Sequence, residues 1–283
     1  MGEHSDWAGS YRRFNSSIEK GYALVCGTQQ GIYAKVKTHP SKLVMSSTMN
    51  DGTIKRFEVE MDPESLRRVA EEGGFWSYGC GVAYEMTVNY HVRGLEINNY
   101  KTDIPIKKGL SSSAALCVLV ARAFNRLYDL KLNVRGEMDL AYRGEVLTPS
   151  RCGRLDQCCA YGSRCVLAVF DGETLTTREI KVKQSLYLVL VDLNASKDTI
   201  EILAGLNKAY PFADTEQHKE VQQFLGPINK KLVTDCIDIL ESDNTHTTTG
   251  SRSSSTATQI GRLMSEFQRL FDKHLTAAVP SQP

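Results

Sequence analysis

The first part of the chain alternates short apolar runs with turn residues, a pattern typical of β-strands. Runs rich in β-branched and aromatic residues predict strands over 22–26, 31–36, 42–45, 53–59, 94–97, 165–170, 174–182 and 186–192. A helix begins at Asp62-Pro63, which suit a helix start, and ends at Gly73-Gly74. The remaining apolar spacing predicts helices over 76–90, 112–128 and 133–147, and a short one after Arg154.

The last part of the chain follows a helical pattern, with helices expected over 199–208, 216–225, 228–241 and 259–274. The last of these places a run of apolar residues on one face at helical spacing: Ile260, Leu263, Met264, Phe267, Leu270 and Phe271. Residues 245–258, rich in Ser and Thr, predict a disordered loop. Strands followed by helices indicate an α+β fold with two lobes, which we expect over 1–183 and 184–283.

Composition narrows the function classes. Hydrophobic residues make up 41% and charged residues 24% of the 283 positions, which is typical of a globular protein. A net charge of +1 disfavours nucleic-acid binding, and the apolar runs are far shorter than the ~18 residues that a membrane span needs. The eight cysteines form no C-x-x-C pair. The first residues do not show the basic and apolar pattern of a signal peptide. We therefore expect a reduced, cytoplasmic protein that acts on a small molecule.

One string between a predicted strand and the most apolar helix carries the chemistry: Pro105-Ile-Lys-Lys-Gly-Leu-Ser-Ser-Ser-Ala-Ala115. Gly109 allows close backbone approach, and Ser111, Ser112 and Ser113 offer hydroxyls. The N–H groups of the first helical turn point toward an anion. The alternative is an ordinary serine-rich helix cap. No Walker-type or G-x-G-x-x-G phosphate motif occurs in the chain.

This string resembles the P-x-x-x-G-L-[GS]-S-S-A-A motif with which GHMP kinases bind ATP. Two further strings agree with it. Residues 2–9, GEHSDWAG, resemble the G-E-H-T-D-Y-x-G signature of the galactokinase branch, with Trp7 in place of Tyr. Residues 152–157, CGRLDQ, resemble that branch's C-G-I-M-D-Q segment. The three strings occur in the family's order.

The resemblance implies a kinase that uses ATP and Mg²⁺. It implies that the nucleotide is bound by Pro105, Gly109, Leu110, Ser111, Ser112, Ser113, Ala114 and Ala115. It also implies that the metal ion is held by Ser112 or Ser113 together with Glu145. The alternative for Glu145 is an ordinary solvated helix carboxylate.

The resemblance also implies which residues bind and activate the molecule that accepts the phosphoryl group. Asp156 takes the proton of the acceptor hydroxyl or orients that hydroxyl, unless it is a helix-capping or surface carboxylate. The acceptor is a small-molecule sugar, bound by Glu3, His4, Asp6 and Gly153. Arg154 either neutralises transferred charge or pairs with a surface acid.

The implied fold has a lobe like the second domain of ribosomal protein S5 and an incomplete ferredoxin-like lobe. The Arg that the family places before G-E-H and its glycine-rich motif near the C-terminus do not occur here. We therefore expect a chain shortened at both ends, weakly stable and poorly active. Two alternatives stay open: a mevalonate-type GHMP kinase, disfavoured by Ser5-Asp6-Trp7, and a non-catalytic sugar- or nucleotide-binding homologue.

Overall fold

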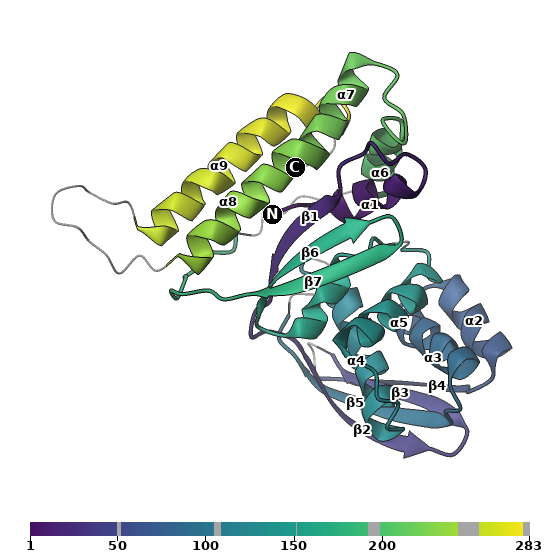
Figure 1. Cartoon of the computed structure of the whole chain (residues 1–283). Helices are drawn as coiled ribbons and strands as arrows, with labels where there is room; N and C mark the ends of the chain where they lie inside the picture. The colour runs from purple at the N-terminus through teal and green to yellow at the C-terminus, as the bar shows by residue number, and fades with distance from the viewer. Residues whose placement is uncertain (50–51, 105–108, 151, 192–198, 243–254, 280–283) are drawn as a thin grey trace. The chain divides into compact units, whose positions relative to one another are not determined.

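The computed structural model describes the chain except residues 50–51, 105–108, 151, 192–198, 243–254 and 280–283 (Figure 1). The chain divides into two compact units, one formed by Met1–Cys26 with Arg164–Pro283 and the other by Gly27–Ser163. The boundary predicted between residues 183 and 184 falls inside the first of these units, because β1 (Gly21–Cys26) pairs along its whole length with β6 (Cys165–Asp171). The lobe limits themselves stay a prediction.

The unit Gly27–Ser163 is a sheet covered by helices on one face (Figure 1). The strand order is β2-β5-β3-β4, and only the β3–β5 pair is parallel. The strands are β2 (Ile32–His39), β3 (Lys42–Thr48), β4 (Ile54–Glu60) and β5 (Gly94–Thr102). The helices are α2 (Pro63–Glu72), α3 (Ser77–Asn89), α4 (Ser112–Leu127), α5 (Val134–Val146) and the 3₁₀ turn η2 (Asp156–Tyr161).

Local chemistry sets the helix limits in this unit. The Asp62 carboxylate accepts a hydrogen bond from the Ser65 backbone N–H at 2.9 Å, and Pro63 occupies the first turn of α2. Gly73 ends the helix with a φ of 82°. Helix α4 buries seven side chains along its length, as expected from its composition: Ala114, Cys117, Val118, Val120, Ala121, Ala123 and Phe124.

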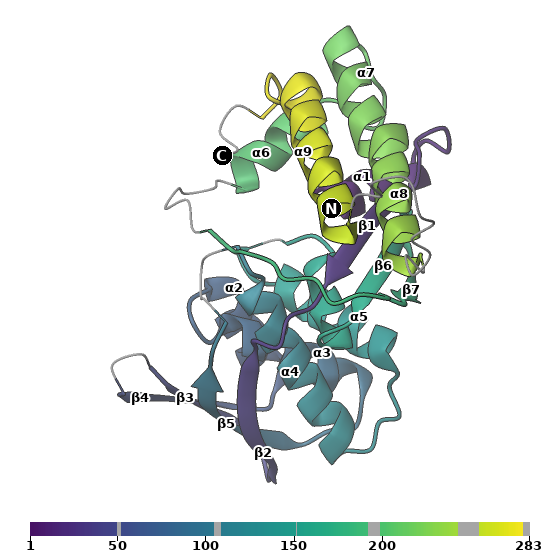
Figure 2. The same ribbon diagram turned by 90° about the vertical axis from the view of Figure 1, so that its left-hand side faces the viewer.

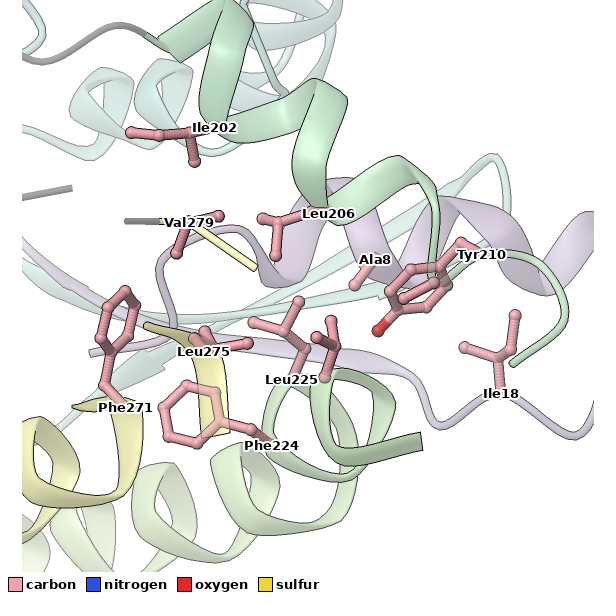
Figure 3. Packing of buried hydrophobic residues seen from close by; sticks show 12 residues of the cluster. Ala8, Ile18, Ile202, Leu206, Tyr210, Phe224, Leu225, Phe271, Leu275 and Val279 are labelled. Carbon is pink, nitrogen blue, oxygen red and sulfur yellow. The ribbon is translucent and has the colours of Figure 1, made fainter. Parts of the chain in front are cut away.

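The other unit combines the antiparallel sheet β1-β6-β7 (β7, Thr174–Ile180) with helices. These are α1 (Ser5–Ser10), η1 (Tyr11–Arg13), α6 (Thr199–Asn207), α7 (Glu216–Gln223), η3 (Phe224–Ile228), α8 (Asn229–Glu241) and α9 (Thr256–Leu275). Helices α8 and α9 lie side by side (Figure 2). Figure 3 shows the core that α1, α6, η3 and α9 share, in which Leu206, Phe224 and Leu275 are fully buried. Both units mix sheet and helix, so the α+β class is confirmed.

The strand predicted over residues 186–192 is not observed in its described part. Residues 186–191 form no strand, and Asp192 lies outside the described residues. Tyr187 and Val189 are 96% and 90% exposed, although apolar runs of this kind normally form strands. The reason is that no strand in the described residues pairs with this segment, and a lone strand leaves its hydrogen-bonding groups unmatched.

The start of α9 also differs from expectation. The Ser255 hydroxyl accepts a hydrogen bond from the Thr258 backbone N–H at 3.2 Å, so the helix begins at Thr256. The loop predicted over 245–258 is therefore wrong for its last residues, and residues 243–254 lie outside the described part of the chain. Met264 is 53% exposed, unlike the other apolar residues of its predicted face. Among the described helices, none is long and apolar enough to cross a bilayer.

Candidate active site

The described part of the serine-rich string, from residue 109 on, forms an open bend that leads into α4. Gly109 is exposed with a φ of 74°, and a Cβ placed there would meet no atom within 4 Å. Ser111, at the start of the helix, has a φ of 58°, and its side chain makes no capping hydrogen bond. The geometry of an ordinary serine cap is therefore absent at Ser111, and the bend is not walled off by the core. Pro105 lies outside the described residues.

The side chains of the string differ in burial. Leu110, Ser112, Ser113 and Ala115 are half-buried, whereas Ala114 is fully buried and anchors the first turn of α4. Since the N–H groups of a first helical turn have no intrahelical acceptor, this turn offers donors to an anion.

Glu145 lies in the last turn of α5 and is 1% exposed. Its carboxylate accepts a hydrogen bond from Gln157 Nε2 at 2.9 Å and another from the Ser113 hydroxyl. Burial raises the pKa of Glu145, the hydrogen bonds from Ser113 and Gln157 oppose that rise, and the charge of Asp156 adds to it. The alternative of a solvated helix carboxylate is wrong, because Glu145 is buried and accepts a hydrogen bond from Ser113 of the serine-rich string.

Asp156 is the first residue of η2 and is exposed. Its charge contributes to the raised pKa of the buried Glu145, so the two predicted acids interact electrostatically. Gly153 is also exposed. Arg154 pairs with Asp139 at 3.2 Å, which is the alternative that the sequence left open for it.

Sequence reasoning did not single out Gln157 as a site residue, although it lies in the quoted string 152–157. Gln157 is 1% exposed and donates to Glu145, while its buried Oε1 atom has no hydrogen-bond partner among the described residues. An orphaned acceptor beside a carboxylate is unusual in a protein interior, which favours a polar ligand or water at this point.

The oxygen atoms near Ser113 are of the kinds that magnesium prefers as ligands. Serine hydroxyls and a carboxylate are hard oxygen ligands, and a cation stabilises a buried carboxylate whose pKa is raised by burial. Among the described residues, His, Cys, Asp and Glu side chains gather nowhere in threes to hold a metal. A magnesium ion at Glu145 would thus take further oxygens from phosphate groups and water.

The N-terminal string lies in the other unit and is tightly packed. His4 and Asp6 are each 7% exposed, whereas Glu3 is exposed. A Cβ on Gly21 would lie 1.9 Å from the Ser5 carbonyl oxygen, so this position of β1 must be glycine for α1 to approach it.

Trp7, the departure from the family signature, has a structural role. Its ring meets Tyr210 edge-on at 5.1 Å between centroids and packs against the core of Figure 3. Of the predicted residues, Glu3, His4 and Asp6 thus belong to one unit, and Ser111, Ser112, Ser113, Gly153, Glu145 and Asp156 to the other.

Comparison with known proteins shows which family this chain resembles. Residues 77–163 match the GHMP kinases N terminal domain. A galactokinase of Haemophilus influenzae (strain PittEE) is 32% identical over 103 residues, which are 35% of this chain and 26% of that protein. A galactokinase of Clostridium beijerinckii is 25% identical over 238 residues, 81% of this chain and 54% of that protein. The chain thus spans about a quarter to half of the length of these relatives.

The fold is also that of a solved relative. The structure of Lactococcus lactis galactokinase complexed with galactose superposes with a TM-score of 0.66 at 16% identity, covering 97% of this chain and 72% of that one. At this identity the likeness shows the fold alone. The matched domain and the galactokinase relatives confirm the resemblance to galactokinase-like GHMP kinases, whereas the acceptor is not decided by the fold.

Proposed function

We propose that this chain, whose residues 77–163 form a GHMP kinase N-terminal domain, transfers the terminal phosphoryl group of ATP to a sugar hydroxyl. The observation that carries the proposal is the convergence of the open bend at Gly109, the Ser113–Glu145 hydrogen bond and the exposed Asp156 in one unit. Phosphoryl transfer needs a phosphate cradle, charge neutralisation and a proton acceptor, and these residues are of the types that supply all three.

The bend and the start of α4 hold the phosphates. Gly109 leaves room for a phosphate to approach the backbone, since no atom lies within 4 Å of its missing Cβ. Ser111, Ser112 and Ser113 are half-buried, so their hydroxyls are partly desolvated and bind an anion more strongly than exposed serines would. The N–H groups of the first turn add partial positive charge.

Glu145, with Ser112 or Ser113, would hold magnesium, which when bound neutralises charge on the β- and γ-phosphates. The Ser113 hydroxyl and Gln157 Nε2 both donate to the Glu145 carboxylate and fix its orientation. Burial raises the pKa of Glu145 because it disfavours the charged carboxylate. A nearby cation would stabilise that charged form.

Asp156 accepts the proton of the acceptor hydroxyl or holds that hydroxyl in line with the phosphorus atom. Its exposure leaves it accessible to an incoming substrate. A carboxylate of ordinary basicity suffices, because the transition state of phosphoryl transfer is largely dissociative and the hydroxyl proton leaves late.

A sugar is the favoured acceptor because of the string GEHSDWAG. His4 and Asp6 are almost buried polar groups, and polar groups of this kind discriminate strongly between ligands that do and do not satisfy them. The galactokinases among the relatives support a hexose. Two hypotheses compete with this one: a mevalonate-type kinase and a non-catalytic binding homologue. No contact among the described residues favours either of them.

The test is an ADP-release assay on the full chain with MgATP and a panel of galactose, arabinose, galacturonate, glucuronate and mevalonate. We expect ADP with at least one sugar and none with mevalonate. ADP with mevalonate alone would establish the mevalonate reading. Calorimetric binding of ATP or a sugar without any turnover would establish the non-catalytic one.

A further inference from the structure

Two cysteines stand directly opposite one another at the end of the β1–β6 pair. Cys26 and Cys165 are registered partners in this antiparallel ladder. Directly opposed residues in such a ladder have Cα atoms about 4.5 or about 5.5 Å apart, depending on the type of pair. Both separations lie within the range of about 4.4 to about 6.8 Å found in disulfides. The register therefore places the Cα atoms of Cys26 and Cys165 at a separation that a disulfide can span.

The two thiols already interact. Cys26 donates a hydrogen bond to the Cys165 sulfur, which lowers the pKa of Cys165 and raises that of Cys26. Two other groups act on the pair: the α-amino group of Met1, and Cys236 on α8. Cys26 is exposed and Cys165 half-buried, so a small reagent reaches them. Cys165 thus has the character of a thiolate with a proton-bearing thiol beside it.

The other six cysteines differ from this pair. Burial raises the pKa of Cys80 to about 12 and also raises that of Cys152 and Cys159. Cys117, Cys158 and Cys236 are buried. Thiols in apolar surroundings remain protonated and react slowly, so chemistry with an oxidant is directed to one place in the chain.

We propose that Cys26 and Cys165 form a redox-reactive pair that hydroperoxides convert into a cross-strand disulfide. The Cys165 thiolate attacks the peroxide, the O–O bond breaks, and a sulfenic acid forms on Cys165 as hydroxide or alkoxide leaves. The Cys26 sulfur then attacks the Cys165 sulfur, and the sulfenic hydroxyl departs with the Cys26 proton as water. The two thiols lose two electrons and two protons, and hydrogen peroxide becomes two molecules of water.

The pair also has a particular place in the chain. The chain leaves the unit of β1 and β6 after Cys26 and returns to it at Arg164. A Cys26–Cys165 bond would therefore close the intervening residues into a covalent ring. Because the β1–β6 ladder holds both ends in the folded state, the ring forms at little cost there and constrains the unfolded chain.

The experiment treats the reduced full chain with hydrogen peroxide, alkylates it with iodoacetamide and maps all eight cysteines by mass spectrometry. We expect a Cys26–Cys165 cross-linked peptide that dithiothreitol removes, with the other six cysteines still alkylated. Oxidation elsewhere first, a sulfinic acid on Cys165 without cross-link, or a cross-link between two chains would overturn the proposal.

Three variants test the order of events, each checked for folding by a thermal melt. In Cys26→Ser, dimedone should trap a sulfenic acid on Cys165, whereas Cys165→Ser should oxidise at Cys26 at least about tenfold more slowly. Cys236→Ser is the matched control and should form the cross-link as the wild type does. Trapping on Cys26 in Cys165→Ser as fast as on Cys165 in Cys26→Ser, or loss of the cross-link in Cys236→Ser, contradicts the assignment. If a variant fails to fold, the mapping of the wild-type chain decides.

Discussion

The two glycine-containing strings use glycine for opposite purposes. In the serine-rich bend, Gly109 has a φ of 74° and open space where a side chain would start. In the N-terminal region, a Cβ on Gly21 would lie 1.9 Å from the Ser5 carbonyl oxygen, and one on Gly9 would lie 2.7 Å from the Phe170 carbonyl oxygen. The first glycine leaves space for a ligand, and the others let backbone segments touch.

The difference predicts where function and stability can be separated. Residues 109–113 of the bend are exposed or half-buried, so changing them alters binding or chemistry with little loss of folding energy. The N-terminal string is packed against β1 and β6, so changing it alters folding first. The four substitutions below test that separation, beginning with the largest expected effect.

Replacing Asp156 by Asn removes the proposed proton acceptor and keeps its size. We expect kcat to fall by about a thousandfold, within the range for general base catalysis. The melting temperature and ATP affinity should stay as in the wild type, because Asp156 is exposed. The measurement is ADP release with parallel calorimetry. Asp129→Asn, an exposed acid in the same unit, is the control, and equal turnover in the two variants would contradict the role of Asp156.

Replacing Gly21 by Ala forces a methyl group into the Ser5 backbone. We expect a loss of about 3 kcal/mol in the free energy of unfolding, since backbone cannot yield as a side chain can. Urea unfolding measures it. Gly261→Ala, a helical position in the same unit with no neighbouring atom within 4 Å, should be as stable as the wild type or more so. Equal stability of both variants would show that α1 can move away from β1.

Replacing Glu145 by Gln tests the buried carboxyl through pH. Its raised pKa means that, between the ordinary carboxyl pKa and the raised one, the folded protein keeps a proton that the unfolded chain has released. Wild-type stability therefore falls as pH rises through that window, and Glu145→Gln should not share this fall. Above the window the variant should melt at a higher temperature than the wild type, while losing magnesium-dependent turnover.

The matched control for this change is Glu137→Gln. Glu137 is a buried acid on the same helix, but it accepts a hydrogen bond from Arg122 Nε at 2.8 Å. Removing its charge breaks an ion pair and should lower the melting temperature. Thermal melts of both variants across pH test this comparison. If both substitutions changed the melting temperature in the same direction, the proposed difference between the two acids would be contradicted.

Replacing Gly109 by Ala should lower the free energy of unfolding by only about 1 kcal/mol, because the one penalty is the left-handed backbone. ATP affinity should fall more than stability does, since the methyl group enters the space proposed for a phosphate. Gly31→Ala, also without a neighbour within 4 Å and without a positive φ, controls for adding a methyl group. Unchanged ATP affinity in Gly109→Ala would remove this glycine from the site.

Much of the fold was predictable because its signals are local. The limits of α2 follow from Asp62, Pro63 and Gly73, each of which acts within one helical turn. The failure at 186–191 has the opposite cause: its composition favours a strand, but a strand exists only with a partner, and pairing is a long-range property. The helix α1 was missed because the six residues 5–10 carry too few positions to show a period.

The candidate site divides in the same way. The serine string, Glu145 and Asp156 could be proposed from sequence, since their residue types and order resemble a family. Neither the burial of Glu145 nor its bond to Gln157 could, because these depend on α4, α5 and η2 packing together.

The sequence by itself determined most helices and strands, and it predicted the serine-rich bend and the acids Glu145 and Asp156 as site residues, because hydrogen-bonding pattern and residue type act over a few neighbouring positions. Only the tertiary structure decided that Glu145 is buried against Ser113, that Gly21 meets Ser5, and that Cys26 faces Cys165. Those contacts join residues distant in the chain, and their energies arise when packing excludes water and brings the groups within bonding distance.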